Sequence, residues 1–469
     1  MTRRQELLRQ ARTQPEALVD HCLHVEQPLA ALQDRLAQTS QNSNKPPVSD
    51  GLTKPPPRSL RRKTGRKPGG QPGHTGHTLQ PVQTPDHVQV HSLTHGFCGQ
   101  CTGVSLRRLP VLDYECRQVF DLPPLRLQVT EHRAEIKVCP VSGRRVSAAF
   151  PSEVQAPVQY GPHFRGLTLY LCNQQLLPLD RLRQTCLDLF GQPLSLGTLI
   201  QTNARAYVTL DPVESALQRA LIQAPVVNLD ESGLRVAGSL HWLQVACTAH
   251  LTFYGVHGKR GTQAMDALGV LPHCRAWLVH DHWQPYYKYD ALHALCNQHL
   301  VRELQFLEEE HPEAWAAELS RFLPDWKGDP LITQGLDEEQ FNKAHARYKR
   351  ILRQGRRDYP RRRAGQGRTQ QSKAANLLDR LEDYDLSVLA FLIDPAVPFT
   401  NNQGEQDIRR IKVKQKISGC FRTLAGARIF ARIRSSLSTC RKQGHNLWEA
   451  GYKLVIGTPI LPDAPASGP

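Results

Sequence analysis

The feature that most constrains the fold is a pair of short apolar runs, each of which ends in an acidic residue. Residues 224–235 read APVVNLDESGLR and deliver Asp230 and Glu231 at the end of a Val-rich run. Pro225 and Gly233 bound this run at about six residues, which predicts a buried strand rather than a helix. Residues 276–283, AWLVHDHW, form a second apolar run that ends in Asp281. Acidic residues at both strand ends indicate a metal or acid/base site.

The residues between the two runs predict how the strands are arranged. SLHWLQVACT and LTFYGVH are strand-like and are separated only by Ala249 and His250, which indicates a hairpin. GTQAMDALGVL has helical spacing, so the order is strand, strand, strand, helix, strand. A right-handed crossover then lays the fourth strand parallel to the first and brings Asp230 and Asp281 to neighbouring strands. We therefore predict a ribonuclease-H-like core within a multidomain α/β chain.

A third acidic residue, Glu405, lies in NNQGEQDIRRIKVKQK, at the head of a basic, helix-like stretch. We predict that it completes one site with Asp230 and Asp281. The simpler interpretation is that Glu405, or equally Asp407, only complements the dipole of this helix. Side chains alternate along a strand, so Glu231 and His280 should point away from Asp230 and Asp281. The basic residues expected to hold DNA beside Glu405 are Arg409, Arg410, Lys412 and Lys416.

The charge of the chain points to a polyanionic partner. The 469 residues carry a formal net charge of +16, which favours nucleic acid first and an anionic membrane surface second. No run approaches the ~18 apolar residues of a membrane span. The charged N-terminal residues lack the apolar segment of a secretory signal, which predicts a cytoplasmic protein. Its twelve cysteines are then thiols or metal ligands rather than a disulfide framework.

Residues 1–40 predict a short helical zipper. The a/d seam of a coiled coil is formed by Leu18, Cys22, Val25, Leu29, Leu32 and Leu36. Pro28 lies inside this seam and removes a helix hydrogen bond. Two interpretations stay open: a self-associating zipper, and a kinked helix packed on its own domain.

Residues 41–90 predict a basic Pro/Gly-rich arm. Between Gly51 and Gln80 the chain carries seven Lys or Arg and no acid. An arm that follows DNA phosphates explains this bias, while a solvated linker is the alternative. The residues expected to contact DNA are Arg61, Arg62, Lys63, Arg66 and Lys67.

Residues 91–150 predict a small zinc-ribbon-like module. Cys98-x-x-Cys101 and Cys139 supply three of the four thiolates of a structural zinc site. Ser142 occupies the place of the fourth cysteine, and the candidate substitutes are Cys116, His95 and His132. One structural Zn²⁺ and a metal-free form of the same module are both open.

The remaining chain divides as follows. Residues 151–220 predict a helical DNA-binding or adaptor segment, and the core occupies residues 221–283 and 395–455. Residues 284–394 predict a helical insertion whose DNA-facing side includes Arg361, Arg362 and Arg363. Placed on one helix, His293, Cys296 and His299 spread too widely for one ion, so core or supporting roles are expected. Residues 456–469 predict a disordered tail.

The order of these pieces resembles the insertion sequence 66 family of DDE transposases, bacterial enzymes that move their own encoding element. The resemblance covers nearly the whole chain, including RKPGGQPGHTGHTL, NLDES, LVHD, CNQHLVRE and NNQGEQDIRRIKVKQKISGCFRT. It implies that Asp230, Asp281 and Glu405 are a catalytic triad holding two Mg²⁺ or Mn²⁺ ions. It also implies small accessory proteins encoded by the same element.

We therefore expect a bacterial, nucleoid-associated transposase that binds element ends and target DNA as a homo-oligomer, then cleaves and joins strands. A catalytically inactive, transposon-derived DNA-binding protein should have lost a carboxylate. A ribonuclease or other nuclease would have little use for the N-terminal DNA-binding parts.

Overall fold

The computed structural model describes residues 78–92, 106, 109–310, 314–361 and 371–463, with single residues at 13, 15, 16, 29, 33 and 73. The zipper of residues 1–40, most of the arm, and part of the zinc-ribbon-like module lie outside this set. So do the following predicted site residues: Arg61, Arg62, Lys63, Arg66, Lys67, Cys98, Cys101, Arg362 and Arg363.

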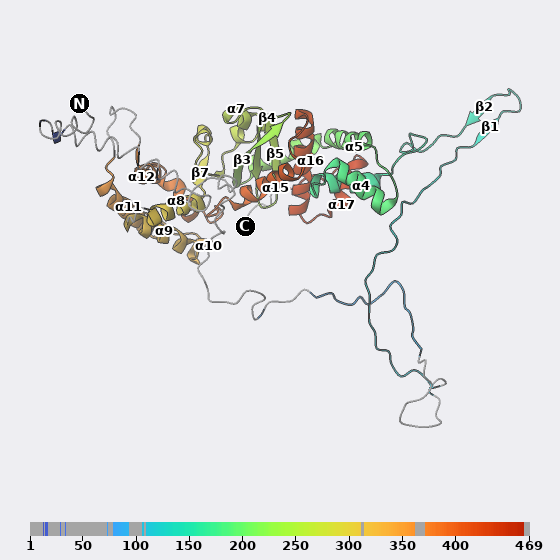
Figure 1. The fold of residues 1–469 in the computed structure, drawn as a ribbon, viewed down its shortest axis with the longest axis horizontal. Helices are drawn as coiled ribbons and strands as arrows, with labels where there is room; N and C mark the ends of the chain where they lie inside the picture. The colour runs from blue at the N-terminus through green and yellow to red at the C-terminus, as the bar shows by residue number, and fades with distance from the viewer. Residues whose placement is uncertain are drawn as a thin grey trace, which may run out of the picture. The chain divides into compact units, whose positions relative to one another are not determined.

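Five strands form one mixed sheet in the order β5-β4-β3-β6-β7 (Figure 1). Neighbouring strands β3/β4 and β4/β5 are antiparallel, whereas β6 runs parallel to β3 and β7 parallel to β6. The predicted hairpin and the parallel placement of the fourth strand beside the first are both confirmed. The strands are β3 (Val226–Val236), β4 (Ser239–Cys247), β5 (Thr252–His257), β6 (Trp277–His280) and β7 (Leu292–Leu295).

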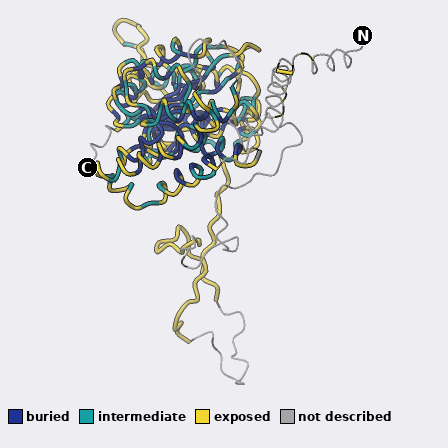
Figure 2. The backbone as a smooth tube through the Cα atoms, turned by 90° about the vertical axis from the view of Figure 1, so that its left-hand side faces the viewer, coloured by how far each residue is buried: buried dark blue, intermediate teal, exposed yellow. Residues whose placement is uncertain are grey.

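Alternation along β3 divides the buried side chains between two apolar clusters. Val227 and Leu229 belong to a cluster that includes residues of α6 and α7, whereas Leu234 and Val236 belong to one with residues of α15 and α16. Figure 2 shows this buried interior in dark blue. The elements around the sheet are α6 (Asp211–Gln223), α7 (Thr262–Leu268), the 3₁₀ turns η4 (Leu271–His273) and η5 (Gln284–Lys288), α15 (Asn402–Ser418) and α16 (Leu424–Lys442).

The fifth strand, β7, lies inside the stretch 284–394 that we expected to be a helical insertion. The helices of this stretch start only at Asn297, and they enclose a third apolar cluster around Trp315, Tyr348 and Phe391. They are α8 (Asn297–Glu310), α9 (Ala314–Lys327), α10 (Leu331–Gln334), α11 (Glu338–Asp358), α12 (Lys373–Asp383), α13 (Asp385–Val388) and α14 (Ala390–Ile393).

Before the sheet, the predicted helical segment is present, and it is interrupted between Phe190 and Ser195. One helix ends at Phe190, and the next is capped by Ser195, whose side chain accepts a hydrogen bond from the Thr198 N–H. Gly166 allows a close helix contact, since a Cβ there would lie 2.7 Å from the Tyr452 backbone nitrogen. The elements are α3 (Pro162–Leu169), the π-helical turn η3 (Tyr170–Gln174), α4 (Leu179–Phe190), α5 (Leu196–Thr209) and the C-terminal α17 (Leu447–Val455).

Residues 131–188 and 192–469 belong to one compact unit, and residues 58–130 with 189–191 to another. This division falls inside the module expected at residues 91–150. The first unit contains the hairpin of β1 (Ile136–Val138) and β2 (Arg145–Ser147), which places Cys139 in its turn. In the second unit, the Gln118 side chain makes two hydrogen bonds of 2.7 Å to the Val82 backbone.

Candidate active site

Strand pairing brings two of the predicted acidic residues together. Asn228 of β3 lies opposite Val279 of β6 in parallel register, and continuing this register by two residues places Asp230 opposite Asp281. Burial, followed by the charges of Glu231 and Asp281, raises the pKa of the Asp230 carboxyl to about 8. The site therefore concentrates negative charge in a poorly solvated place, which favours a bound cation.

Glu231 is more closely involved in this site than we expected. It alternates with Asp230 along β3, but its side chain is only 3% exposed. Burial and the nearby charge of Asp281 raise the pKa of the Glu231 carboxyl. The Tyr286 hydroxyl donates a 2.6 Å hydrogen bond to Glu231 Oε2, and Arg260 pairs with Oε1. The prediction that Glu231 simply points away from Asp281 was thus incomplete.

Arg260 is held by two aromatic rings while it pairs with Glu231. Its guanidinium carbon lies 4.6 Å from the ring centre of Trp242 and 4.0 Å from that of Trp283. Stacking of this kind fixes a guanidinium as well as attracting it. Nothing in the sequence singled out Arg260 or Tyr286, because their roles depend on contacts between separate segments.

His280 is fully buried and takes no part in a carboxylate contact. Its Nε2 lies 3.1 Å from Nδ1 of His293, on the adjacent strand β7. Burial lowers the pKa of His280 well below its usual value, so its imidazole is neutral.

Asn401 anchors the start of α15 against β3. Its side-chain amide donates a 2.6 Å hydrogen bond to the Leu229 carbonyl and accepts a 2.9 Å bond from Asn228. Gly404 permits this contact, because a Cβ there would lie 2.9 Å from Asn401 Oδ1. Glu405 follows within the first turn, where its N–H donates to the Asn401 carbonyl. The third predicted carboxylate therefore lies on an element fixed to the residue that precedes Asp230.

The nearest ionisable partner of Glu405 is a histidine. Oε1 of Glu405 lies 3.6 Å from Nε2 of His299 and is buried without a hydrogen-bond partner. Together with Cys296 they form, within the described residues, the group of three whose metal-ligating atoms all lie within 4.8 Å of one another. Asp230, Asp281 and Glu405 together do not form such a group.

His293, Cys296 and His299 do not lie on one helix, so the prediction that they could not share an ion started from a wrong premise. His293 is in β7, Cys296 follows that strand, and His299 is in the first turn of α8. His293 contacts His280, whereas Cys296 and His299 lie beside Glu405.

The basic residues predicted to hold DNA beside Glu405 lie at the surface of α15. Arg409, Arg410, Lys412 and Lys416 are all exposed, and the charge of Lys412 opposes the rise in the Asp230 pKa. Arg361, the described member of the basic triplet in the insertion, forms an ion pair with Asp383. An exposed cationic helix thus borders the carboxylates.

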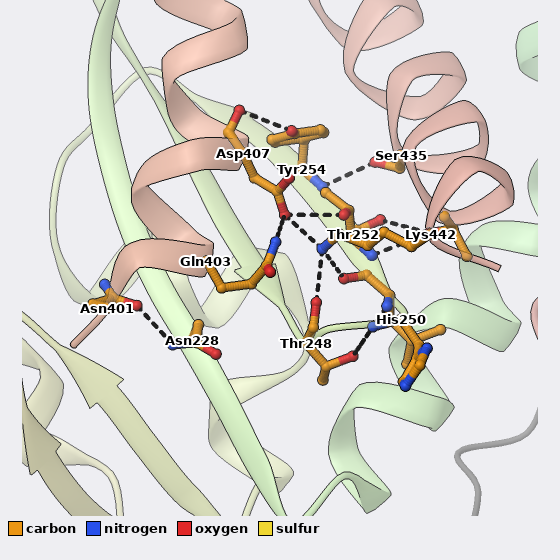
Figure 3. A network of polar contacts seen from close by, with 12 residues as sticks. Asn228, Thr248, His250, Thr252, Tyr254, Asn401, Gln403, Asp407, Ser435 and Lys442 are labelled. Atoms are coloured by element: carbon orange, nitrogen blue, oxygen red, sulfur yellow. Dashed lines mark hydrogen bonds and ion pairs between the residues drawn. The ribbon is translucent and has the colours of Figure 1, made fainter. Parts of the chain in front are cut away.

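Asp407 does not complement the helix dipole at the surface, as the simpler interpretation allowed. It is buried and pairs with Lys442 of α16 at 2.7 Å (Figure 3). The Thr252 hydroxyl donates a 3.1 Å hydrogen bond to the same carboxylate oxygen. Asp407 therefore joins α15 to α16 and β5.

Cys139, the described member of the predicted zinc ligands, lies in the β1–β2 turn. Its N–H donates to the Arg144 carbonyl at 2.8 Å, and Gly143 takes a φ of 67°. Hydrogen bonds from the side chain and backbone of Ser142 lower the pKa of the Cys139 thiol. Ser142 thus lies beside the sulfur, where a fourth cysteine was expected in sequence.

Comparison with known families agrees with this arrangement. Residues 157–429, more than half of the chain, match the model of the Transposase IS66 family. The chain belongs to the Transposase IS66 family. The match spans the sheet, all three acidic residues and the helical insertion, so family membership supports a transposase role with DNA as substrate and with divalent metal use.

A second family model matches the N-terminal part of the chain. Residues 3–80 match a family of unknown function, DUF6444, which spans the predicted zipper and most of the arm of this transposase. No curated protein is significantly similar to the chain. Among the residues that the structure describes, no helix is long and apolar enough to cross a membrane.

Proposed function

We propose that this transposase binds the ends of an insertion sequence and catalyses metal-dependent DNA cleavage and strand transfer. Asp230, Asp281 and Glu405 are its catalytic residues and the ligands of two Mg²⁺ or Mn²⁺ ions. The observation that carries the proposal is the parallel pairing of β3 with β6, together with the contribution of the Asp281 charge to the raised pKa of the Asp230 carboxyl.

We also propose that the sheet is a ribonuclease-H-like core. An antiparallel meander of three strands, extended by two parallel strands, supports this assignment. Helices α8–α14 form an insertion between the strands and α15. Helix α15 carries Glu405 and begins beside β3. We propose the same boundaries as in the sequence analysis for the zipper, the arm, the zinc-ribbon-like module and the helical segment before the core.

The residues present fit divalent cations. Carboxylate oxygens are the ligands that Mg²⁺ prefers, and Glu405 Oε1 is buried without a hydrogen-bond partner. Bound there, the cations would activate a water or a 3′-hydroxyl and stabilise the leaving oxygen. Within the protein, Asn401 positions Glu405, whereas Arg260 and Tyr286 hold the Glu231 carboxylate beside Asp281.

DNA contacts are assigned to three cationic segments of the chain. The exposed residues of α15 would hold the backbone beside Glu405, and the arm and the Arg361–Arg363 triplet would extend the contact. We propose further that one structural Zn²⁺ binds Cys98, Cys101 and Cys139. We propose that the protein assembles as a homo-oligomer on DNA and works with small accessory proteins. We propose that it acts in the cytoplasm, at the nucleoid. Because all three carboxylates are present, nothing favours an inactive DNA-binding protein.

Glu405→Gln tests the catalytic assignment. It keeps the size of the side chain but removes the anionic ligand, so Mg²⁺-dependent cleavage and strand transfer should be abolished. The substrate is duplex DNA carrying the terminal sequences that flank the gene. Folding and binding to these ends should stay close to those of the unchanged protein. Glu449→Gln, which alters an exposed acid of α17, is the matched control and should retain activity.

Cleavage by the Glu405→Gln protein at close to the normal rate would remove Glu405 from the site. Loss of DNA binding together with cleavage would also count against the assignment, because the change would then act through folding or affinity.

A further inference from the structure

The group formed by Cys296, His299 and Glu405 has the composition of a transition-metal site. One ligand atom from each residue lies within 4.8 Å of the others, although the group comes from two segments more than 100 residues apart. Cys296 directly precedes α8, and His299 lies in the first turn of that helix. Glu405 approaches them from the first turn of α15.

Two polar atoms of this group are buried without a hydrogen-bond partner. Oε1 of Glu405 and Nδ1 of His299 are both buried and have no hydrogen-bond partner. Oε1 lies 3.6 Å from Nε2 of His299, which is too long for a hydrogen bond. Unsatisfied buried polar atoms are rare in folded proteins, and a bound metal ion would satisfy the carboxylate oxygen.

Backbone N–H groups point at the sulfur of Cys296 from two segments. The Asn401 N–H points at Sγ from 3.2 Å, and the backbone N–H groups of Gln298 and His299 point at it from the start of α8. Backbone donors at a helix N-terminus favour the thiolate, which is the form that binds metals. Burial nevertheless raises the pKa of this thiol to about 11, so a metal must displace the proton, which passes to solvent.

We propose that Cys296, His299 and Glu405 form a binding site for Zn²⁺. Thiolate, imidazole and carboxylate are the three ligand types that zinc takes, and three protein ligands leave a fourth position for water or a DNA phosphate. Mg²⁺ prefers oxygen ligands, so a site with sulfur and imidazole discriminates against it.

The consequence for catalysis rests on the proposed function. Glu405 is shared by this site and by the proposed Mg²⁺ site, and its carboxylate contacts His299 in this structure. Zinc held by Cys296 and His299 would keep the carboxylate away from Asp230 and Asp281. Zn²⁺ would therefore inhibit a transposase of this kind by competing for one ligand.

Metal binding is measured directly with Co²⁺, which replaces Zn²⁺ and reports a bound thiolate by its charge-transfer absorption. The test uses the full chain with Cys98, Cys101 and Cys139 changed to serine, in excess Mg²⁺ and under a phosphine reductant. One equivalent of Co²⁺ should produce the thiolate band. Loss of an outer partner of a metal ligand costs about 10–100-fold in affinity, so Cys296→Ser and His299→Asn should each cost at least about 100-fold.

The control is Cys440→Ser in α16. Cys440 is a buried thiol whose pKa burial likewise raises to about 11, but it belongs to no metal-binding group among the described residues. Its variant should bind Co²⁺ as the parent does. Absence of the thiolate band from the parent would overturn the proposal, even if a variant failed to fold. So would a band that survives Cys296→Ser.

A second measurement separates this proposal from the catalytic one. Zn²⁺ should inhibit Mg²⁺-dependent cleavage, and Cys296→Ser should weaken that inhibition at least about tenfold relative to the variant's own zinc-free rate. If Glu405→Gln still cleaves DNA while Co²⁺ binding depends on Cys296, the catalytic assignment fails and the zinc site stands. If Glu405→Gln abolishes cleavage but the parent binds no Co²⁺ through sulfur, the zinc site fails alone.

Discussion

Replacing Asp407 by asparagine should destabilise the fold by about 3 kcal/mol, because it removes one half of a buried ion pair. The Asp407 side chain is 7% exposed and that of Lys442 is 13% exposed. Lys442 Nζ donates to Asp407 at 2.7 Å and to the carbonyls of Thr248 and Leu251 at 2.7 and 2.8 Å (Figure 3). After the substitution the ammonium group keeps the two carbonyls but loses its counter-charge.

The magnitude follows from how little water reaches the pair. Breaking a buried ion pair by removing one partner costs about 3–5 kcal/mol, whereas an exposed pair contributes about 0–1 kcal/mol. We take the lower end of the first range because the two carbonyls still bind Lys442. Thr252 also loses an anionic acceptor, since its hydroxyl donates to the same carboxylate.

Equilibrium unfolding in urea, followed by tryptophan fluorescence and circular dichroism, measures the change. The control is Glu449→Gln, which disrupts the exposed pair of Glu449 with Lys453 and should cost less than about 0.5 kcal/mol. Adding Lys442→Met to Asp407→Asn should recover at least about 1 kcal/mol, because the unpaired charge is then gone. An Asp407→Asn protein within about 0.5 kcal/mol of the parent, or no recovery in the double variant, would refute the reasoning.

Three further predictions concern other parts of the chain. Deleting the arm from Lys54 to Lys67 should weaken binding to all DNA sequences alike and flatten the dependence of log affinity on log salt; an unchanged slope would remove the arm from the interface. Purified Cys296→Ser protein, which lacks the other proposed zinc site, should contain about one zinc that is lost when Cys98→Ser is added, and metal analysis of the Cys296→Ser protein without zinc would favour the metal-free module. Gly166→Ala should cost at least about 1 kcal/mol in urea unfolding, since its Cβ would meet the Tyr452 backbone at 2.7 Å. Gly197→Ala in α5, where the nearest atom is 3.7 Å away, should be neutral or stabilising by up to about 1 kcal/mol, and an equal effect of both changes would contradict this account.

Several features of the candidate site followed from local patterns. The apolar runs before Asp230 and Asp281 predicted strands, and a crossover of fixed hand then predicted parallel neighbours. The predicted length of about six residues was wrong for the first strand, because β3 continues through Asp230 and Glu231 to Val236. The register of Asn228 with Val279 agrees with that prediction. The two residues between the runs of β4 and β5 likewise predicted a hairpin, which the structure contains.

Other features were not predicted, because the sequence pattern of a short strand or helix is weak. The four residues of β7 are too few to reveal alternation, so the strand was read as part of a helical stretch. That error also placed His293, Cys296 and His299 on one helix. The resulting conclusion about a shared ion depended on a secondary structure that the chain does not have.

The sequence by itself determined the strand periods, the position of Asp281 directly after a strand, and the basic character of α15. These depend on the order of neighbouring residues, because alternation and helix turns relate side chains a few positions apart. Only the tertiary structure decided that Asn401 meets Leu229, 172 residues away, and that Asp407 meets Lys442 in the interior. It also decided that Glu405 lies beside Cys296 and His299. Contacts of this kind arise when separate elements pack together. The periodicity of one segment does not show which residue of a distant segment it will contact.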